Sequence, residues 1–457
     1  MIVVRAVAAL VVLWLIGALA LACIGARRPG GPGVAADFAA GTAILAFVGS
    51  VAVVAGARVS VLPFYGLAAV LAAAVWRRRP GLRISGAWPR DRIALTLLAV
   101  AGASLASLFV SSLGDRLWWD GWVIWALKAR VLFLEGTLPP GFLDPEGAYA
   151  FAHPGYPLAL PLVNWWLYRH AGAAAPALAS LCGTVWLALL PLVLWGALRE
   201  RTGERVAALA AAGTVTFWPL AVNAAGGTAD VVVALALLGA VGELDRGLSR
   251  ADPGAFVRCG VYLSLGAMAK MEGLVLALAA AVVGIGSLVR RGERSVRAVL
   301  PFALPFILVA PWHGFAAARG LGRQFVSASL APEVIGERIL LVIGAFGDMA
   351  LEPPWLPLVI LAGIGVLRRT SAAGWFVLGG HIAALAVAYV LTPLDMIWLI
   401  ETSSWRLLGA CVPALLYLSL SGVAAASDPG AATGDRASRS RDRGSVRQEG
   451  GVRAART

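Results

Sequence analysis

Residues 91–133 read DRIALTLLAVAGASLASLFVSSLGDRLWWDGWVIWALKARVLF. The part from Ile93 to Leu113 is almost wholly apolar, and roughly 20 helical residues cross the ~30 Å hydrocarbon core of a bilayer. The part after it combines charged residues with several tryptophans, which are common at membrane surfaces. The stretch therefore predicts a membrane-spanning helix followed by a segment at the water–lipid boundary.

The composition extends this interpretation to the whole chain. Of its 457 residues, 60% are hydrophobic and 14% are charged, and the mean hydropathy is +0.81. Soluble globular chains carry about 25% charged residues. We therefore expect an all-α polytopic membrane protein.

Apolar runs of spanning length recur along the chain. They predict about thirteen spans near residues 2–26, 38–56, 60–76, 91–113, 174–198, 204–222, 229–247, 254–270, 273–289, 297–318, 353–367, 372–393 and 405–426.

The basic residues predict the orientation of these spans. With Arg27 and Arg28 on the cytoplasmic side, alternation places 27 of the 38 Lys and Arg residues there and 11 outside. This is the positive-inside pattern, and it accounts for the net charge of +13 without a nucleic-acid partner. A bacterial inner membrane is the expected location. Residues 427–457 are polar, basic and free of aromatics, which predicts a disordered cytoplasmic tail.

The organisation along the chain follows from these spans. Residues 1–90 hold the N-terminal transmembrane helices, and residues 91–426 hold the main membrane core. Residues 114–172 form one large outer segment, because the apolar stretch at 156–168 is short and contains Pro157 and Pro161. We expect interfacial helices in it, the first near 121–135.

Asp120 lies where this outer segment begins. An Asp before a helix is most often an N-cap, whereas a carboxylate at the water–lipid boundary could also act as a general base. The tryptophans around it either anchor the segment in the interface or stack on sugar rings, and anchoring is the commoner role.

Three further polar residues are candidates for the same pocket. His153 and Tyr156 lie in AHPGYP, where prolines are expected to hold the backbone extended. They serve either as a rigid entry to the next helix or as the lining of a polar pocket. Asp230 opens the span at 229–247, where it is either a cap or a site residue.

The cations are few on the outer side. Lys128 and Lys270 are the only lysines, and Lys270 shares a tight turn with Glu272 in MAKMEGL. The turn is either a weak surface ion pair or a phosphate contact. Arg406 is expected one residue into a helix, at an end that disfavours cations, which favours a bound anion. His313 and His381 lie inside spans, where satisfied core histidines are expected.

In order along the chain, WWDGWVIWALKARVLF, AHPGYPLALPL, TADVVVALAL, LGAMAKMEGL and YVLTPLDMIWLIETSSWRLL resemble the GT-C class of membrane glycosyltransferases. The resemblance is to the bacterial branch related to protein O-mannosyltransferases and aminoarabinose transferases, glycosyltransferase family 39. It covers most of residues 91–413.

The resemblance implies a GT-C-like catalytic core and a polyprenyl-phosphate sugar as donor. It also implies an extracytoplasmic glycan, lipid or protein hydroxyl as acceptor. Asp120 matches the family's base, Asp230 its later acidic residue, Lys270 its lysine turn and Arg406 its late arginine. Transfer would invert the anomeric carbon.

The chain also departs from the family. Many relatives carry paired acids where this chain has Asp120 and Gly121, so no metal ligands are assigned, although the resemblance leaves room for a divalent metal. Three spans precede the family-like core. A transporter or flippase of lipid-linked sugars and an O-antigen ligase or polymerase are the alternatives. Transporters usually place charges near the membrane midplane, and such ligases would carry more arginines than residues 319–352 do.

Overall fold

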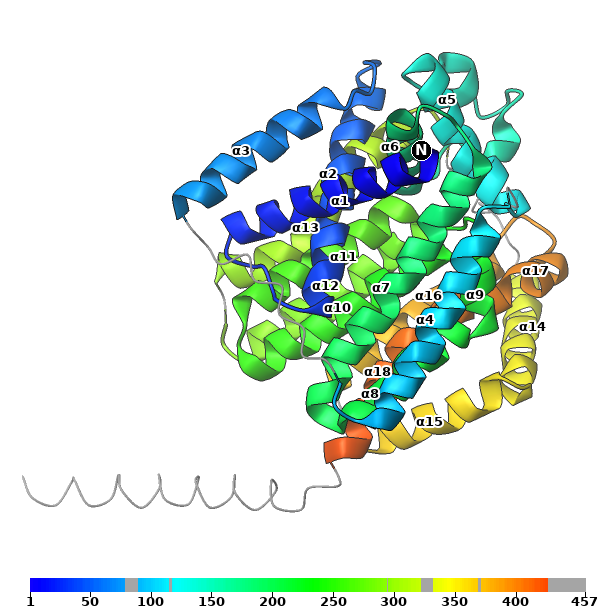
Figure 1. The fold of residues 1–457 in the computed structure, drawn as a ribbon. Helices are drawn as coiled ribbons and strands as arrows, with labels where there is room; N and C mark the ends of the chain where they lie inside the picture. Colours follow the sequence, from blue (N-terminus) through cyan, green and yellow to red (C-terminus); the bar gives the residue numbers. More distant parts are fainter. Residues whose placement is uncertain (79–88, 115–116, 294, 322–331, 369–370, 426–457) are drawn as a thin grey trace, which may run out of the picture.

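The computed structural model describes residues 1–78, 89–114, 117–293, 295–321, 332–368 and 371–425. Every regular element in these ranges is a helix (Figure 1). The expected tail at 427–457 lies outside the described residues. The fold class is thus confirmed as an all-α polytopic membrane protein.

The helices follow the expected spans closely. In chain order they are α1 (Ile2–Cys23), α2 (Gly31–Val54), α3 (Leu62–Arg78), α4 (Arg92–Ser112), η1 (Gly121–Ala126), α5 (Leu127–Glu135), η2 (Pro140–Leu143), η3 (Ala150–Ala152), α6 (Ala159–Ala171), α7 (Pro176–Thr202), α8 (Glu204–Thr216), α9 (Trp218–Ala225), α10 (Asp230–Arg250), α11 (Pro253–Ala269), α12 (Met271–Arg290), α13 (Val296–Ala318), α14 (Pro332–Leu351), α15 (Trp355–Leu367), α16 (Ala372–Leu391), α17 (Met396–Gly409) and α18 (Val412–Ala425).

By their length and composition, fewer helices could span a membrane than the sequence pattern predicted. Among the described residues, seven single helices are long and apolar enough, or ten spans if each of three bent helix pairs is one. The other three expected spans are α3, α10 and α11. Two of them, α3 and α11, have 17 residues each, and α10 carries several charges.

Two expected spans are broken helices. Residues 204–222 divide into α8 and α9, which meet at 52°, and Pro219 lies in the first turn of α9. Residues 405–426 divide at Ala410, and the two parts meet at 42°. Pro413 follows this second break. Proline lacks the backbone N–H that an uninterrupted helix needs, so it is found at such starts.

The first outer segment is helical, as expected, but its second helix is not exposed. Helix α6 is buried from Ala159 to Tyr168, and Trp166 Nε1 donates a hydrogen bond to the carbonyl of Ala9 at 2.9 Å. The segment at 319–352 likewise contains a helix, α14. Residues 322–331 lie outside the described ranges.

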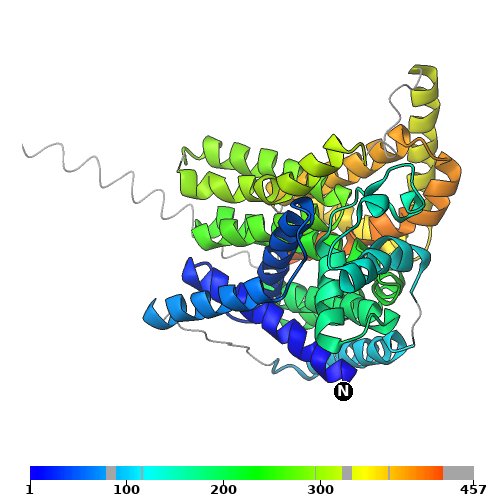
Figure 2. The ribbon, with the colours of Figure 1, turned by 90° about the horizontal axis from the view of Figure 1, so that it is seen from above.

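Helices α1 and α2 pack tightly together and reach the core. A Cβ on Gly17 would lie 1.8 Å from the carbonyl oxygen of Asp37, and one on Gly41 would lie 2.0 Å from that of Leu13. Only glycine permits this approach. Helices α1 and α3 lie side by side at one edge, while α2 reaches in to contact α7 and α11 (Figures 1 and 2).

A network of ion pairs connects the α1–α2 loop to α10 and α11, at the end of the bundle opposite the α11–α12 turn. Glu243 on α10 pairs with Arg28 at 3.3 Å and with Arg258 at 2.8 Å. Arg258 also donates to the carbonyl of Ala26 at 2.7 Å. Glu243 and Arg258 are 4% and 3% exposed, so each charge depends on its partner for stabilisation.

We predict that Glu243→Gln lowers the free energy of unfolding by about 3–5 kcal/mol, because it leaves two arginines without their shared carboxylate. Glu200→Gln is the matched control, since its pair with Arg250 is about half exposed. The control should change stability by less than ~0.5 kcal/mol. Thermal unfolding of both variants in nanodiscs would measure this, and equal midpoints would contradict it.

Candidate active site

The expected site residues come from distant stretches and meet at one end of the bundle. Asp120 precedes η1, Asp230 opens α10, Lys270 and Glu272 lie at the α11–α12 turn, and Arg406 lies near the end of α17. They form two ion-paired groups.

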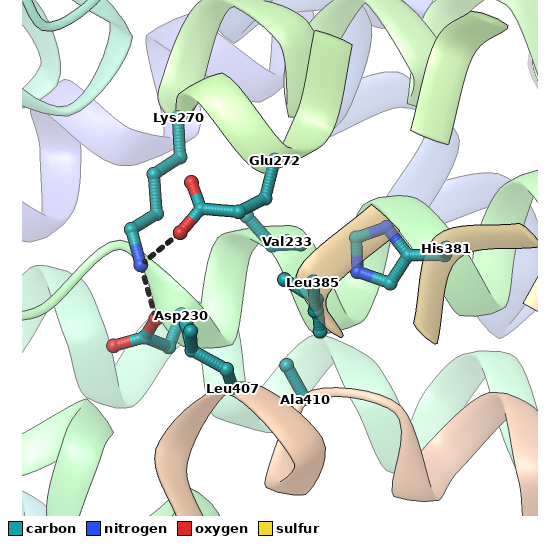
Figure 3. A pocket seen from close by; sticks show the side chains of 8 residues that line it. All are labelled: Asp230, Val233, Lys270, Glu272, His381, Leu385, Leu407 and Ala410. Atoms are coloured by element: carbon teal, nitrogen blue, oxygen red, sulfur yellow. Dashed lines mark hydrogen bonds and ion pairs between the residues drawn. The ribbon is translucent and has the colours of Figure 1, made fainter. Parts of the chain in front are cut away.

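Lys270 is the centre of the first group (Figure 3). Its Nζ lies 2.8 Å from Asp230 Oδ1 and 2.9 Å from Glu272 Oε1. Lys270 is 8% exposed and Asp230 2%. The weak surface pair considered for Lys270 and Glu272 is therefore wrong, because these charges are removed from water and bound together.

The turn that carries Lys270 is shaped by two glycines. Lys270 is the single non-helical residue between α11 and α12, with an extended backbone. A Cβ on Gly273 would lie 2.0 Å from the carbonyl oxygen of Gly266. The absence of both side chains lets the helices approach closely, and the lysine extends toward Asp230 on α10.

The second group joins Asp120 and Arg406. Arg406 Nη1 lies 2.6 Å from Asp120 Oδ2. The Asp120 side chain is 32% exposed and that of Arg406 is 14% exposed. Asp120 makes no side-chain capping bond to η1, so the cap expected as its commoner role is not formed. The carboxylate is instead bound by the guanidinium and partly open to solvent.

The expected helix position of Arg406 was wrong. Residues 396–409 form their own helix, so Arg406 lies in the last turn of α17 and not in a first turn. A cation is favoured there by the helix dipole. The position of Arg406 in its helix therefore gives no reason to expect a bound anion. Its role is instead inferred from its ion pair with Asp120.

The two groups are close enough to interact electrostatically. The positive charge of Arg406 interacts electrostatically with the carboxylates of both Asp230 and Asp120. Three carboxylates and two cations give the cluster a net charge of −1 when all five are ionised. A phosphate entering here must therefore compete with carboxylates that the cations already bind.

Lys128 lies next to His153 and Tyr156, within the segment 114–172. Its Nζ donates to the carbonyl oxygen of His153 at 2.6 Å and lies 5.7 Å and 5.8 Å from the ring centres of Trp125 and Tyr156. Lys128 is fully buried, and among the described residues no carboxylate pairs with it. Burial without a counter-charge holds the pKa of its ammonium well below the usual range.

Tyr156 faces the charged cluster. Burial raises the pKa of its phenol, and nearby Glu272 raises it further, while Lys270 lowers it. Its ring stacks on Trp125 with centres 5.5 Å apart. The two roles considered for Tyr156, a rigid entry to the next helix and the lining of a polar pocket, both stay predictions.

The extended backbone expected at His153 was wrong. Its φ is 47°, in the left-handed region, at the end of the short helix η3. The Lys128 bond reaches the carbonyl of this residue. Burial lowers the pKa of the imidazole, as does Lys128, while Asp120 raises it.

The sequence analysis missed two residues of α16. His381 is 1% exposed, lines a small cavity with Asp230, Lys270 and Glu272, and its Nδ1 has no hydrogen-bond partner among the described residues. His381 is buried, as expected of a core histidine, and it also faces the Lys270 group. Tyr389 Oη and Ser403 Oγ are 2.7 Å apart, which joins α16 to α17. The eight-residue spacing of His381 and Tyr389 on one helix face was the available signal.

Gly121 explains why a second acid is missing beside Asp120. A Cβ at Gly121 would lie 1.8 Å from the carbonyl oxygen of Gly226, in the α9–α10 connection. The described residues contain no group of three or more His, Cys, Asp or Glu side chains that could hold a metal ion. The donor set therefore does not fit a metal, since Asp230 and Glu272 both bind Lys270.

We predict that Gly121→Ala removes activity, because the added methyl group pushes η1 and Asp120 away from Arg406. Gly141→Ala is the matched control in the same outer segment, since a Cβ there meets nothing within 4 Å. Turnover of both purified variants would be compared. Full activity of the Gly121 variant would contradict the packing argument.

We predict that Lys128→Met stabilises the protein at neutral pH and weakens donor binding. Because the folded-state pKa of Lys128 is lowered, the unfolded chain binds more protons between that value and the usual lysine pKa, and stability rises with pH across this window. The variant should lose that rise. Unfolding midpoints across pH 6–10 test this, and a lower midpoint for the variant at pH 7 would contradict it.

Residues 165–315 match the sequence profile of the dolichyl-phosphate-mannose-protein mannosyltransferase family. No curated protein sequence is significantly similar to the chain. The matched range includes Asp230, Lys270 and Glu272, whereas Asp120 and Arg406 lie on either side of it. The match covers 151 of the 457 residues and, together with the helical membrane fold, supports a GT-C-like membrane glycosyltransferase.

Proposed function

We propose that the protein transfers a sugar from a polyprenyl-phosphate donor to an acceptor hydroxyl outside the cytoplasm, with Asp120 as general base and inversion at the anomeric carbon. The observation that carries this proposal is the partly exposed Asp120 carboxylate, bound by Arg406 beside the buried Lys270 group. The acceptor is a glycan, lipid or protein hydroxyl.

The reaction needs one proton transfer and one displacement. Asp120 takes the proton of the acceptor hydroxyl as its oxygen bonds to the anomeric carbon. The bond from that carbon to the donor phosphate breaks, and the electron pair leaves with the phosphate oxygen. Polyprenyl phosphate is a stable anion, so its departure needs cations and no proton donor.

The three cations differ in how many carboxylates already bind them, so they are expected to contribute differently to binding a phosphate. Lys270 is held between two carboxylates and Arg406 is held by one, whereas no described carboxylate neutralises Lys128. Lys128 is fully buried and donates to the His153 carbonyl, so in its protonated form it acts on a phosphate through its charge and not by direct contact. Arg406 is the cation most available for contact, because its side chain is partly exposed and a phosphate that binds it bidentately competes with Asp120.

This competition couples donor binding to activation of the base. While Arg406 binds Asp120, the guanidinium occupies a carboxylate oxygen that could otherwise take the proton of the acceptor hydroxyl. A donor phosphate that draws the guanidinium away frees that oxygen. Donor binding should then precede productive acceptor binding.

Location and orientation are part of the proposal. The basic residues favour a bacterial inner membrane with the site facing the periplasm or exterior, where lipid-phosphate sugars are the available donors. The gathering of the candidate residues at one end of the bundle favours an enzyme over a transporter, whose charges usually lie near the midplane.

We predict that Asp120→Asn reduces transfer by about 10²–10⁴-fold, because the amide cannot accept the proton. Donor binding should persist, since the anion no longer competes for Arg406. Release of polyprenyl phosphate from a labelled lipid-phosphate sugar would be measured in proteoliposomes. Glu401→Gln is the control, an exposed carboxylate on the same helix as Arg406. Full transfer by the folded Asp120 variant would refute the assignment.

A further inference from the structure

Tryptophans surround the Asp120–Arg406 pair. Trp118 lies two residues before Asp120 in the chain, and Trp405 directly precedes Arg406. The ring centres of Trp118 and Trp405 are 5.7 Å apart. Trp405 also contacts Trp218 of α9, with centres 5.1 Å apart. Trp119 and Trp122 form a second pair at 6.3 Å. We call these five residues the tryptophan surface.

Part of the tryptophan surface is open. Trp119 is 69% exposed, Trp218 62% and Trp122 45%. The ring of Trp118 packs closely against Gly226, where an added Cβ would lie 2.9 Å from it. Asp120 lies in the chain between Trp119 and Trp122 and is itself partly exposed. The partly exposed carboxylate and the exposed indoles of Trp119 and Trp122 thus belong to one short stretch of chain.

The distribution of tryptophans differs from that of an anchoring belt, which would encircle the bundle. The described ranges contain 16 of the 17 tryptophans of the chain, and five of these 16 are exposed. Three of the five belong to the tryptophan surface, and Trp398 lies on the helix that carries Trp405. The fifth, Trp76, lies near the C-terminal end of α3. Exposed indoles at the site end are thus confined to one flank.

We propose that the tryptophan surface binds the acceptor and that the acceptor is a saccharide. This inference rests on the proposed transferase function and narrows its acceptor class. The flat C–H face of a pyranose ring packs on an indole, whose electron-rich face attracts the C–H hydrogens. A ring held there keeps its hydroxyls at its edge, where Asp120 can reach one.

A peptide acceptor fits this surface less well. One common way to bind an extended peptide is through main-chain hydrogen bonds to an exposed strand edge. Helices and connecting turns make up the described part of the chain, which offers no such edge. Charged side chains that could orient a peptide terminus near Asp120 are paired within the site.

The test uses the full chain in proteoliposomes with a labelled polyprenyl-phosphate sugar. Two probes are compared as acceptors, a set of p-nitrophenyl pyranosides and a serine-containing hexapeptide. Trp119→Leu and Trp122→Leu should raise the acceptor KM for the pyranosides about tenfold and leave the donor KM unchanged. Trp119→Phe and Trp122→Phe should retain most of the affinity, and Trp76→Leu is the control for a lost exposed indole.

The outcomes separate the two proposals. Transfer to the pyranosides with the KM pattern above supports the inference. Transfer to the peptide alone, or pyranoside KM values unchanged in the Leu variants, overturns the inference and leaves the transferase function intact. Parallel loss of membrane insertion in the Leu variants assigns the indoles to anchoring and also overturns it. No release of polyprenyl phosphate by the wild-type protein with either probe overturns the transferase function and this inference with it.

Discussion

The binding of Lys270 by Asp230 and Glu272 is the interaction on which the site depends. A charge inside a helix bundle surrounded by lipid is costly unless an opposite charge contacts it. Here one ammonium group draws together the start of α10 and both sides of the α11–α12 turn. The same arrangement favours the observed position of Arg406 on α17, because its positive charge is attracted to Asp230 as well as to Asp120.

The two ends of the bundle use ion pairs for different purposes. At the end away from the site, Arg28, Arg258 and Glu243 satisfy one another inside the protein and hold α1 and α2 against α10 and α11. At the site end, the pair of Asp120 and Arg406 is partly open, and Lys128 has no described counter-charge. A buried, unneutralised cation costs stability, a cost that an anion bound near it would offset.

The helical fold and the identity of the meeting residues could be predicted from the sequence, because apolar runs, basic turns and outer charges leave direct signals. Asp120, Asp230, Lys270 and Arg406 were all expected at one face and do meet there. Their pairing could not be predicted, since it depends on helix crossings fixed by Gly121 and Gly273. The helix end at Arg406 was misplaced because the apolar run continues across the break at Ala410, and Pro413, which marks that break, was not used to divide it. His381 was expected in the core and was not assigned to the site, because its spacing from Tyr389 indicates a shared helix face but not the residues that this face meets.

Sidedness is the claim on which the mechanism rests most heavily, and it can be measured directly. Trp119→Cys, in a chain whose four cysteines are replaced by serine or alanine, places a thiol at an exposed position beside Asp120. Ser295→Cys places one at an exposed position at the opposite end. In intact cells whose outer barrier has been opened, a membrane-impermeant maleimide should label position 119 at once and position 295 only after lysis of the inner membrane. Labelling of position 295 first, with position 119 protected until lysis, would contradict the account.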